Sequence, residues 1–143
     1  MISECKYSSS IHILTLKLGR ISNALALNIG SDSWELTQVA LAFATAEAQN
    51  HLFKIFLFLS IDFTSYTCTL SDIVKLVNKY GNHSNQFKVN GKPMVSSYEG
   101  GCLGNSGWQS LKEKTNAYIM AFISGLEGHF SEWPALDSWY WLV

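Results

Sequence analysis

Charge is scarce in this sequence. Asp, Glu, Lys and Arg together make up 15% of the 143 residues, and the formal net charge is −1. Proteins that bind nucleic acid usually carry a basic surplus, and proteins that bind a membrane surface usually carry clustered Lys and Arg. The sequence has neither feature, so its composition predicts no nucleic-acid partner and no membrane partner.

Several diagnostic motifs are also missing. The longest apolar run, residues 55–61, is far too short to cross a bilayer. Residues 1–10 are polar, so the sequence as given predicts no secretory leader. The four His show no metal-ligand spacing, and there is no Cys-x-x-Cys pair, glycine-rich phosphate loop or Gly-x-Ser-x-Gly elbow. The sequence therefore offers no support for a zinc, phosphate-loop or serine-hydrolase site.

Apolar and aromatic side chains are abundant. Hydrophobic residues make up 48% of the chain, including five Trp, six Tyr and eight Phe. This composition predicts one globular domain over residues 1–143. Most of the aromatic side chains are expected in the core, although a surplus also suits a site that stacks on sugar rings. Asn82-His83-Ser84 has the form of an N-glycosylation acceptor, a short pattern that also occurs by chance.

Apolar segments of strand length alternate with segments of helical periodicity. We expect strands at residues 24–29, 53–61, 92–98, 118–123 and from 136 onward, and helices at 34–50, 71–81 and 108–115. Asn90-Gly91 predicts a tight hairpin before the third of these strands. The alternation indicates parallel βαβ units. A complete (β/α)₈ barrel takes about 250 residues, so the pattern fits either a small doubly wound sheet or part of a barrel.

Polar residues stand where the expected strands end. They are Asn28, Asp62, Glu99 and Asp137. Chemistry in parallel α/β folds is located at the carboxyl ends of the strands, and a pair of carboxylates across a pocket suits glycoside hydrolysis. The structural alternative is that each carboxylate caps a turn and that the Asn28 side chain forms hydrogen bonds with backbone groups of a loop.

The Trp and Cys residues also allow two interpretations. Trp34, Trp108 and Trp139 are either packing residues or platforms for a sugar ring. Cys68 and Cys102 each follow an expected strand end by a few residues. They are either joined in a disulfide or present as two buried thiols.

Four blocks of the sequence resemble glycoside hydrolase family 71, the fungal α-1,3-glucanases or mutanases. The blocks are residues 24–34, 58–62, 87–100 and 132–139, and they occur in the order and spacing of the family. The block at 87–100 is the most specific. The resemblance extends from about residue 14 to residue 141.

The resemblance implies a partial (β/α)₈ TIM barrel, with about five parallel strands and incomplete at both ends. It implies inverting hydrolysis of α-1,3-glucan, outside the cell or in the cell wall, without a metal or organic cofactor. By position, Asp62 and Glu99 are the catalytic candidates. The substrate-binding candidates are Asn28, Trp34, Trp108, Asp137 and Trp139.

The sequence also departs from the family. Residues 1–15 do not look like the family's first strand, and the later Trp-Asn-Asp-Tyr-Gly-Glu-Ser-like segment, which looks like the source of acid and base carboxylates, does not occur in the 143 residues. We therefore expect impaired or absent hydrolysis from this chain alone. The alternatives are a non-catalytic carbohydrate-binding remnant and a fragment that does not fold stably. The oligomeric state is not predicted.

Overall fold

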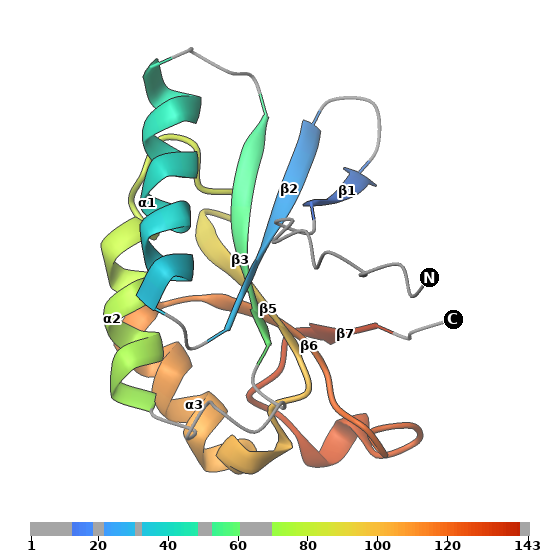
Figure 1. Cartoon of the computed structure of the whole chain (residues 1–143). Coiled ribbons are helices and arrows are strands. Elements are labelled where there is room, and N and C mark those ends of the chain that lie inside the picture. Colours follow the sequence, from blue (N-terminus) through green and yellow to red (C-terminus); the bar gives the residue numbers. More distant parts are fainter. Residues whose placement is uncertain (1–12, 19–21, 31–32, 49–52, 61–69, 141–143) are drawn as a thin grey trace, which may run out of the picture.

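The computed structural model describes residues 13–18, 22–30, 33–48, 53–60 and 70–140. Their elements follow one another along the chain as shown in Figure 1. They are β1 (Ile13–Leu18), β2 (Ser22–Ile29), α1 (Ser33–Ala48), β3 (Lys54–Ser60), α2 (Leu70–Tyr80), β4 (Lys88–Val89), β5 (Lys92–Tyr98), η1 (Gly101–Leu103), α3 (Gly104–Thr115), β6 (Tyr118–Phe122), η2 (Phe130–Glu132) and β7 (Ser138–Trp139).

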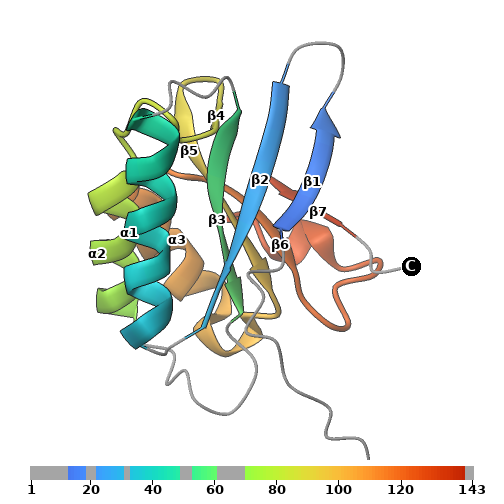
Figure 2. The same cartoon turned by 45° about the horizontal axis from the view of Figure 1, so that its top comes forward.

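The order of strands in the sheet follows their order in the sequence. The path runs β1-β2-β3-β5-β6-β7, with β4 paired to β5, and the pairs from β2 to β7 along this path are parallel. The helices α1, α2 and α3 lie together on one face of the sheet (Figures 1 and 2). A doubly wound sheet reverses its strand order and carries helices on both faces. The winding here is that of part of a (β/α)₈ barrel, as the family resemblance implied.

Strand β1 is an addition to the predicted pattern. It pairs antiparallel with β2, from Ile13 opposite Leu27 to Leu18 opposite Ser22. Only residues 19–21 separate the two strands, so an antiparallel ribbon is the arrangement that such a short connection permits. The first strand predicted from the sequence is at residues 24–29, so β1 was not predicted.

The hairpin between β4 and β5 confirms the prediction from Asn90-Gly91. Both residues are left-handed, with φ of 51° and 78°. A tight hairpin turn that matches the twist of its strands needs this conformation, which Asn and Gly adopt at the least cost. The turn places Lys92 at the start of β5 and so determines which β5 side chains face the helices.

Alternating side chains of the strands form two apolar layers. In β3, Ile55 and Leu57 belong to the larger cluster, which packs against the helices. Phe56 and Phe58 point to the opposite face, where they join a smaller cluster with Ala26. The helix-covered face is therefore the main core. The opposite face corresponds to the interior of a barrel, and we call it the inner face.

Candidate functional site

The inner face presents side chains in rows across neighbouring strands. One row runs from β2 to β7, because the parallel registers pair its members in succession. Its members are Asn28, Phe58, Ser96, Met120 and Ser138. Such rows are the layers that fill the interior of a barrel. The next row, toward the carboxyl ends of the strands, contains the paired Tyr98 and Phe122.

Four aromatic rings gather on the inner face, near the carboxyl ends of the strands. The rings of Tyr98 and Phe122 stack with centroids 5.4 Å apart. Tyr140 lies 6.0 Å from Phe122 and 6.4 Å from Phe58. All four side chains are half-buried, so each keeps part of its surface accessible. We call Phe58, Tyr98, Phe122 and Tyr140 the inner-face aromatic cluster, a continuous apolar surface at the end of the sheet where barrel chemistry is located.

Tyr140 fastens this cluster to β5. Its hydroxyl donates a hydrogen bond to the carbonyl oxygen of Ser97 at 2.9 Å. Burial raises the pKa of Tyr140 to about 12, although the nearby Ser96 side chain lowers it. The phenol is therefore protonated at neutral pH and serves as a hydrogen-bond donor.

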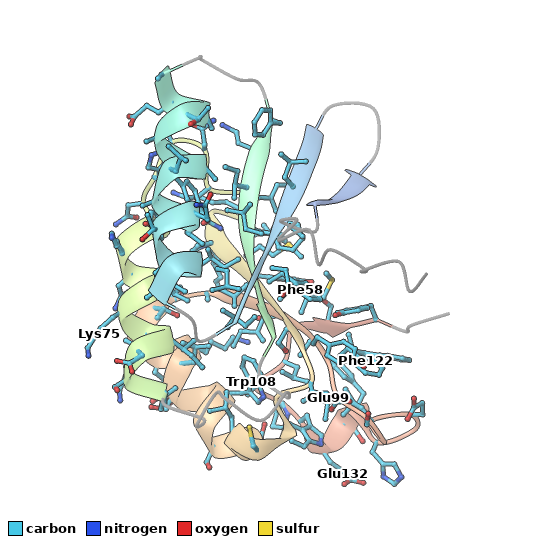
Figure 3. All side chains as sticks on the ribbon, viewed as in Figure 1. Phe58, Lys75, Glu99, Trp108, Phe122 and Glu132 are labelled. Atoms are coloured by element: carbon cyan, nitrogen blue, oxygen red, sulfur yellow. The ribbon has the colours of Figure 1, made fainter. Side chains whose placement is uncertain are left out.

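Glu99 follows β5 directly and has a left-handed backbone, with φ of 60°. The Ser97 hydroxyl donates to the Glu99 carbonyl oxygen at 2.7 Å, which supports this turn. The Ser124 backbone N–H donates to Glu99 Oε2 at 2.9 Å, and the Ser124 hydroxyl donates to Oε1. Ser124 follows β6, so this clasp joins the carboxyl ends of two neighbouring strands. Figure 3 labels Glu99 and Phe122 among the side chains at this end of the sheet.

Trp108 supports the same turn from the helix side. Its indole Nε1–H donates to the carbonyl oxygen of Gly100 at 3.1 Å, and its side chain is fully buried. A ring without exposed surface offers no face to a sugar. The structure thus places Trp108 among the packing residues, where it holds the residue that follows Glu99.

Asp137 lies at the opposite end of the sheet, which corrects its predicted position at a carboxyl end. It precedes β7, and its backbone N–H donates to the carbonyl oxygen of Ile119 at 2.9 Å. Its Oδ2 accepts from the Ile119 N–H at 2.9 Å, and its Oδ1 pairs with Lys112 Nζ at 2.7 Å. These contacts attach the start of β7 to β6 and α3. The position does not support a substrate contact.

The other substrate-binding candidates differ in placement. Asn28 is exposed on β2, in the same row as Phe58, near the carboxyl end. Trp139 is half-buried and packs against the helix-side core, with its ring 6.2 Å from Phe130. Trp34 lies in the first turn of α1, and its side chain is outside the described residues. Asn28 is therefore placed beside the inner-face aromatic cluster, whereas Trp139 packs on the helix-covered face.

Two of the predicted positions, Asp62 and Cys68, lie outside the described residues. Cys102 is disulfide-bonded. Since Cys5 and Cys68 are both outside the described part of the chain, the pairing of Cys102 with Cys68 stays a prediction.

Comparison with known proteins decides the family. Residues 15–142 match the family model described as glycosyl hydrolase family 71. The chain belongs to glycosyl hydrolase family 71. This confirms the resemblance, which the sequence blocks placed at residues 14–141.

Two relatives of this family-71 chain are known from Schizosaccharomyces pombe. One is an ascus wall endo-1,3-alpha-glucanase, 29% identical over 93 residues, which are 61% of this chain and 21% of the relative. The other is glucan endo-1,3-alpha-glucosidase agn1, 31% identical over 78 residues, which are 54% of this chain and 18% of the relative. The chain thus spans about a fifth of the length of these relatives. No solved structure matches it.

The inner-face aromatic cluster of this family-71 chain was not predicted from the sequence. The signal was present in β3, where Phe56 and Phe58 alternate with residues that face the helices. Tyr98, Phe122 and Tyr140 each occupy the inner face at or beyond the end of a strand, but no common motif links them. Their proximity depends on the register of three strands, which spacing along the sequence does not reveal.

Proposed function

We propose that the chain forms part of an enzyme that hydrolyses α-1,3-glucosidic bonds in glucan, outside the cell or in the cell wall. The observation that carries the proposal is the family match over residues 15–142. The names of both relatives refer to 1,3-alpha-glucan as substrate. Glu99 directly follows Tyr98 of the aromatic cluster, and this supports the proposal, since sugar rings pack on aromatic faces while carboxylates act on the glycosidic bond.

Inverting hydrolysis requires two carboxyl groups roughly 6.5–9.5 Å apart. One protonates the leaving oxygen, and the other activates a water molecule on the opposite face of the sugar. We propose Glu99 and Asp62 for this pair. Support comes from the sheet: β3 and β5 are parallel neighbours, with Ser60 opposite Tyr98. Glu99 follows Tyr98 directly, and Asp62 follows Ser60 by two residues.

Asn28 and the inner-face aromatic cluster are proposed to hold the glucan. Phe58, Tyr98 and Phe122 offer partly exposed ring faces. Asn28 adds an amide in the row of Phe58, where it can exchange hydrogen bonds with sugar hydroxyls.

The experiment that tests hydrolysis is reducing-sugar release from insoluble α-1,3-glucan, with circular dichroism of each sample to verify folding. We expect Glu99→Gln and Asp62→Asn to lower turnover by roughly 10²-fold or more, because each removes a proton-transfer group. Glu113→Gln, an exposed carboxylate on α3, is the matched control. Folded Glu99→Gln and Asp62→Asn variants with unchanged turnover would remove these residues from the mechanism. The anomer released first is expected to be β, and a first product of α configuration would exclude inversion.

We also propose that hydrolysis of glucan by the 143-residue chain on its own is impaired or absent. Both carboxylate oxygens of Glu99 accept hydrogen bonds from Ser124. These bonds occupy one acceptor site on each oxygen and hold the carboxylate against Ser124, which leaves fewer sites for a substrate. Release at a rate typical of glycosidases from the purified chain would contradict this.

The same clasp favours an alternative, a non-catalytic carbohydrate-binding protein. In that case the aromatic surface binds glucan while Glu99 only shapes the turn. Co-sedimentation with insoluble glucan would then fall for Phe122→Ala and remain for Leu41→Ala, a control on the exposed surface of α1. Binding without sugar release, unaffected by Glu99→Gln, would support this alternative.

A further inference from the structure

The turn that follows α2 carries a feature that the proposed function does not use. Asn82-His83-Ser84 is the single Asn-x-Ser/Thr triplet in the 143 residues. The side chains of Asn82 and Ser84 are both exposed. An N-glycosylation acceptor needs this triplet on an accessible loop of a secreted protein.

The backbone of this turn is fixed, and the Asn82 side chain is exposed. The Gly81 N–H donates to the Val77 carbonyl oxygen at 2.7 Å, and the His83 N–H donates to the Tyr80 carbonyl oxygen at 2.9 Å. These bonds hold the residues on both sides of Asn82. The Asn82 amide itself makes no hydrogen bond to other described residues. Attachment of a glycan to its nitrogen therefore breaks no contact of the folded chain.

The turn is also remote from the candidate site. Lys54 Nζ, at the start of β3, donates to the Ser84 carbonyl oxygen at 2.9 Å, which places the turn at the amino end of the sheet. Glu99 is at the carboxyl end, and the seven residues of β5 span roughly 20 Å between the two ends. Figure 2 shows β4, which follows this turn, at that far end of the sheet. A glycan on Asn82 would leave the inner-face aromatic cluster open.

The disulfide at Cys102 indicates that the chain folds in an oxidising compartment. Disulfides persist in secreted proteins and in the lumen of the endoplasmic reticulum, and are rare in the cytosol. Asparagine-linked glycans are attached in the same lumen.

We propose that Asn82 is an N-glycosylation site. A transferase would form a bond between Asn82 Nδ2 and the anomeric carbon of an oligosaccharide carried on a lipid diphosphate. The bond between that carbon and the diphosphate oxygen breaks, the lipid diphosphate leaves, and Nδ2 loses one proton to the transferase. The proposal is independent of the proposed glucan hydrolysis.

The test is translation of the full chain, placed behind a cleavable secretory leader, in the presence of microsomal membranes. Only chains protected from added protease are scored, because these have entered the lumen. We expect one glycan-sized increase in mass that peptide N-glycosidase removes. Asn82→Gln and Ser84→Ala should lose it, and Ser84→Thr should keep it. Protected wild-type chain without the increase would overturn the proposal, as would an increase that persists in Asn82→Gln.

Discussion

Asp137→Asn separates a structural role of this carboxylate from a role in the site. Asp137 has 20% of its side chain exposed, and its partner Lys112 has 23%. The substitution keeps the size of the side chain but removes its charge and one acceptor. The remaining oxygen can serve either Lys112 or the Ile119 N–H, and the new amide N–H₂ faces whichever donor is left.

The expected cost is about 2 kcal/mol of the free energy of unfolding. Hydrogen bonds to charged groups contribute roughly 1.5–3 kcal/mol each, and partial exposure reduces this. With a denaturant slope of about 2 kcal/mol/M, the urea midpoint should fall by about 1 M. Asp72→Asn is the matched control. Its partner Lys75 lies 2.9 Å away, but the two side chains are 57% and 76% exposed. We expect a change within about 0.5 kcal/mol there.

Glucan co-sedimentation of the folded variants completes the assay. Because Asp137 lies at the amino end of β7, binding by folded Asp137→Asn should equal that of the wild type. Equal urea midpoints for the two variants, together with weaker glucan binding by Asp137→Asn, would refute the structural role. They would indicate instead that Asp137 contributes to glucan binding.

Three further predictions concern single contacts. Trp108→Phe should lower the free energy of unfolding by roughly 1–3 kcal/mol in urea titration, because the Gly100 carbonyl oxygen keeps only its bond from the Leu103 N–H and a small cavity opens. An unchanged urea midpoint would contradict a stabilising hydrogen bond from Trp108. The hydrogen bond that the His129 ring donates to the Glu132 carboxylate raises the pKa of His129 above its usual 6.5, so stability from this pair is present below pH 6.5 and lost as pH rises through the folded pKa. Nuclear magnetic resonance titration of Glu132→Gln should find the His129 pKa closer to 6.5, and an unaltered pKa would contradict the pairing. Gly91→Ala should cost about 1–2 kcal/mol in thermal unfolding, because φ is 78° there, and no loss of stability would argue against the left-handed turn.

Local chemistry made part of the fold predictable. The turn at Asn90-Gly91 needs two left-handed residues, and this demand is visible in the sequence. The parallel strands were recognisable as short apolar runs between helical segments. The choice between a doubly wound sheet and barrel winding depends on which distant strands pair, so it required the structure.

The site residues also differ in how far the sequence predicts them. Glu99 was predictable because it directly follows a seven-residue strand that the turn at Asn90-Gly91 and the glycines Gly100-Gly101 delimit in the sequence. Asp137 was misplaced because β7 comprises two residues, too few for periodicity to show where it begins. The bond from Trp108 to Gly100 and the clasp from Ser124 to Glu99 join residues on different elements. Nothing in the spacing along the chain indicates such pairs.

The agreement between strand order and chain order also bears on how the protein folds. Each strand from β2 to β7 on the sheet path pairs with the strand that precedes it on that path. The segments between successive strands of the path are short, and the longest of them carry a single α-helix each. A chain that emerges from its amino end during synthesis can therefore add each unit to the edge of the preceding one, without waiting for its carboxyl end. Pairing between near neighbours also limits the entropy lost at every step. Assembly in the direction of translation is a consequence of this winding.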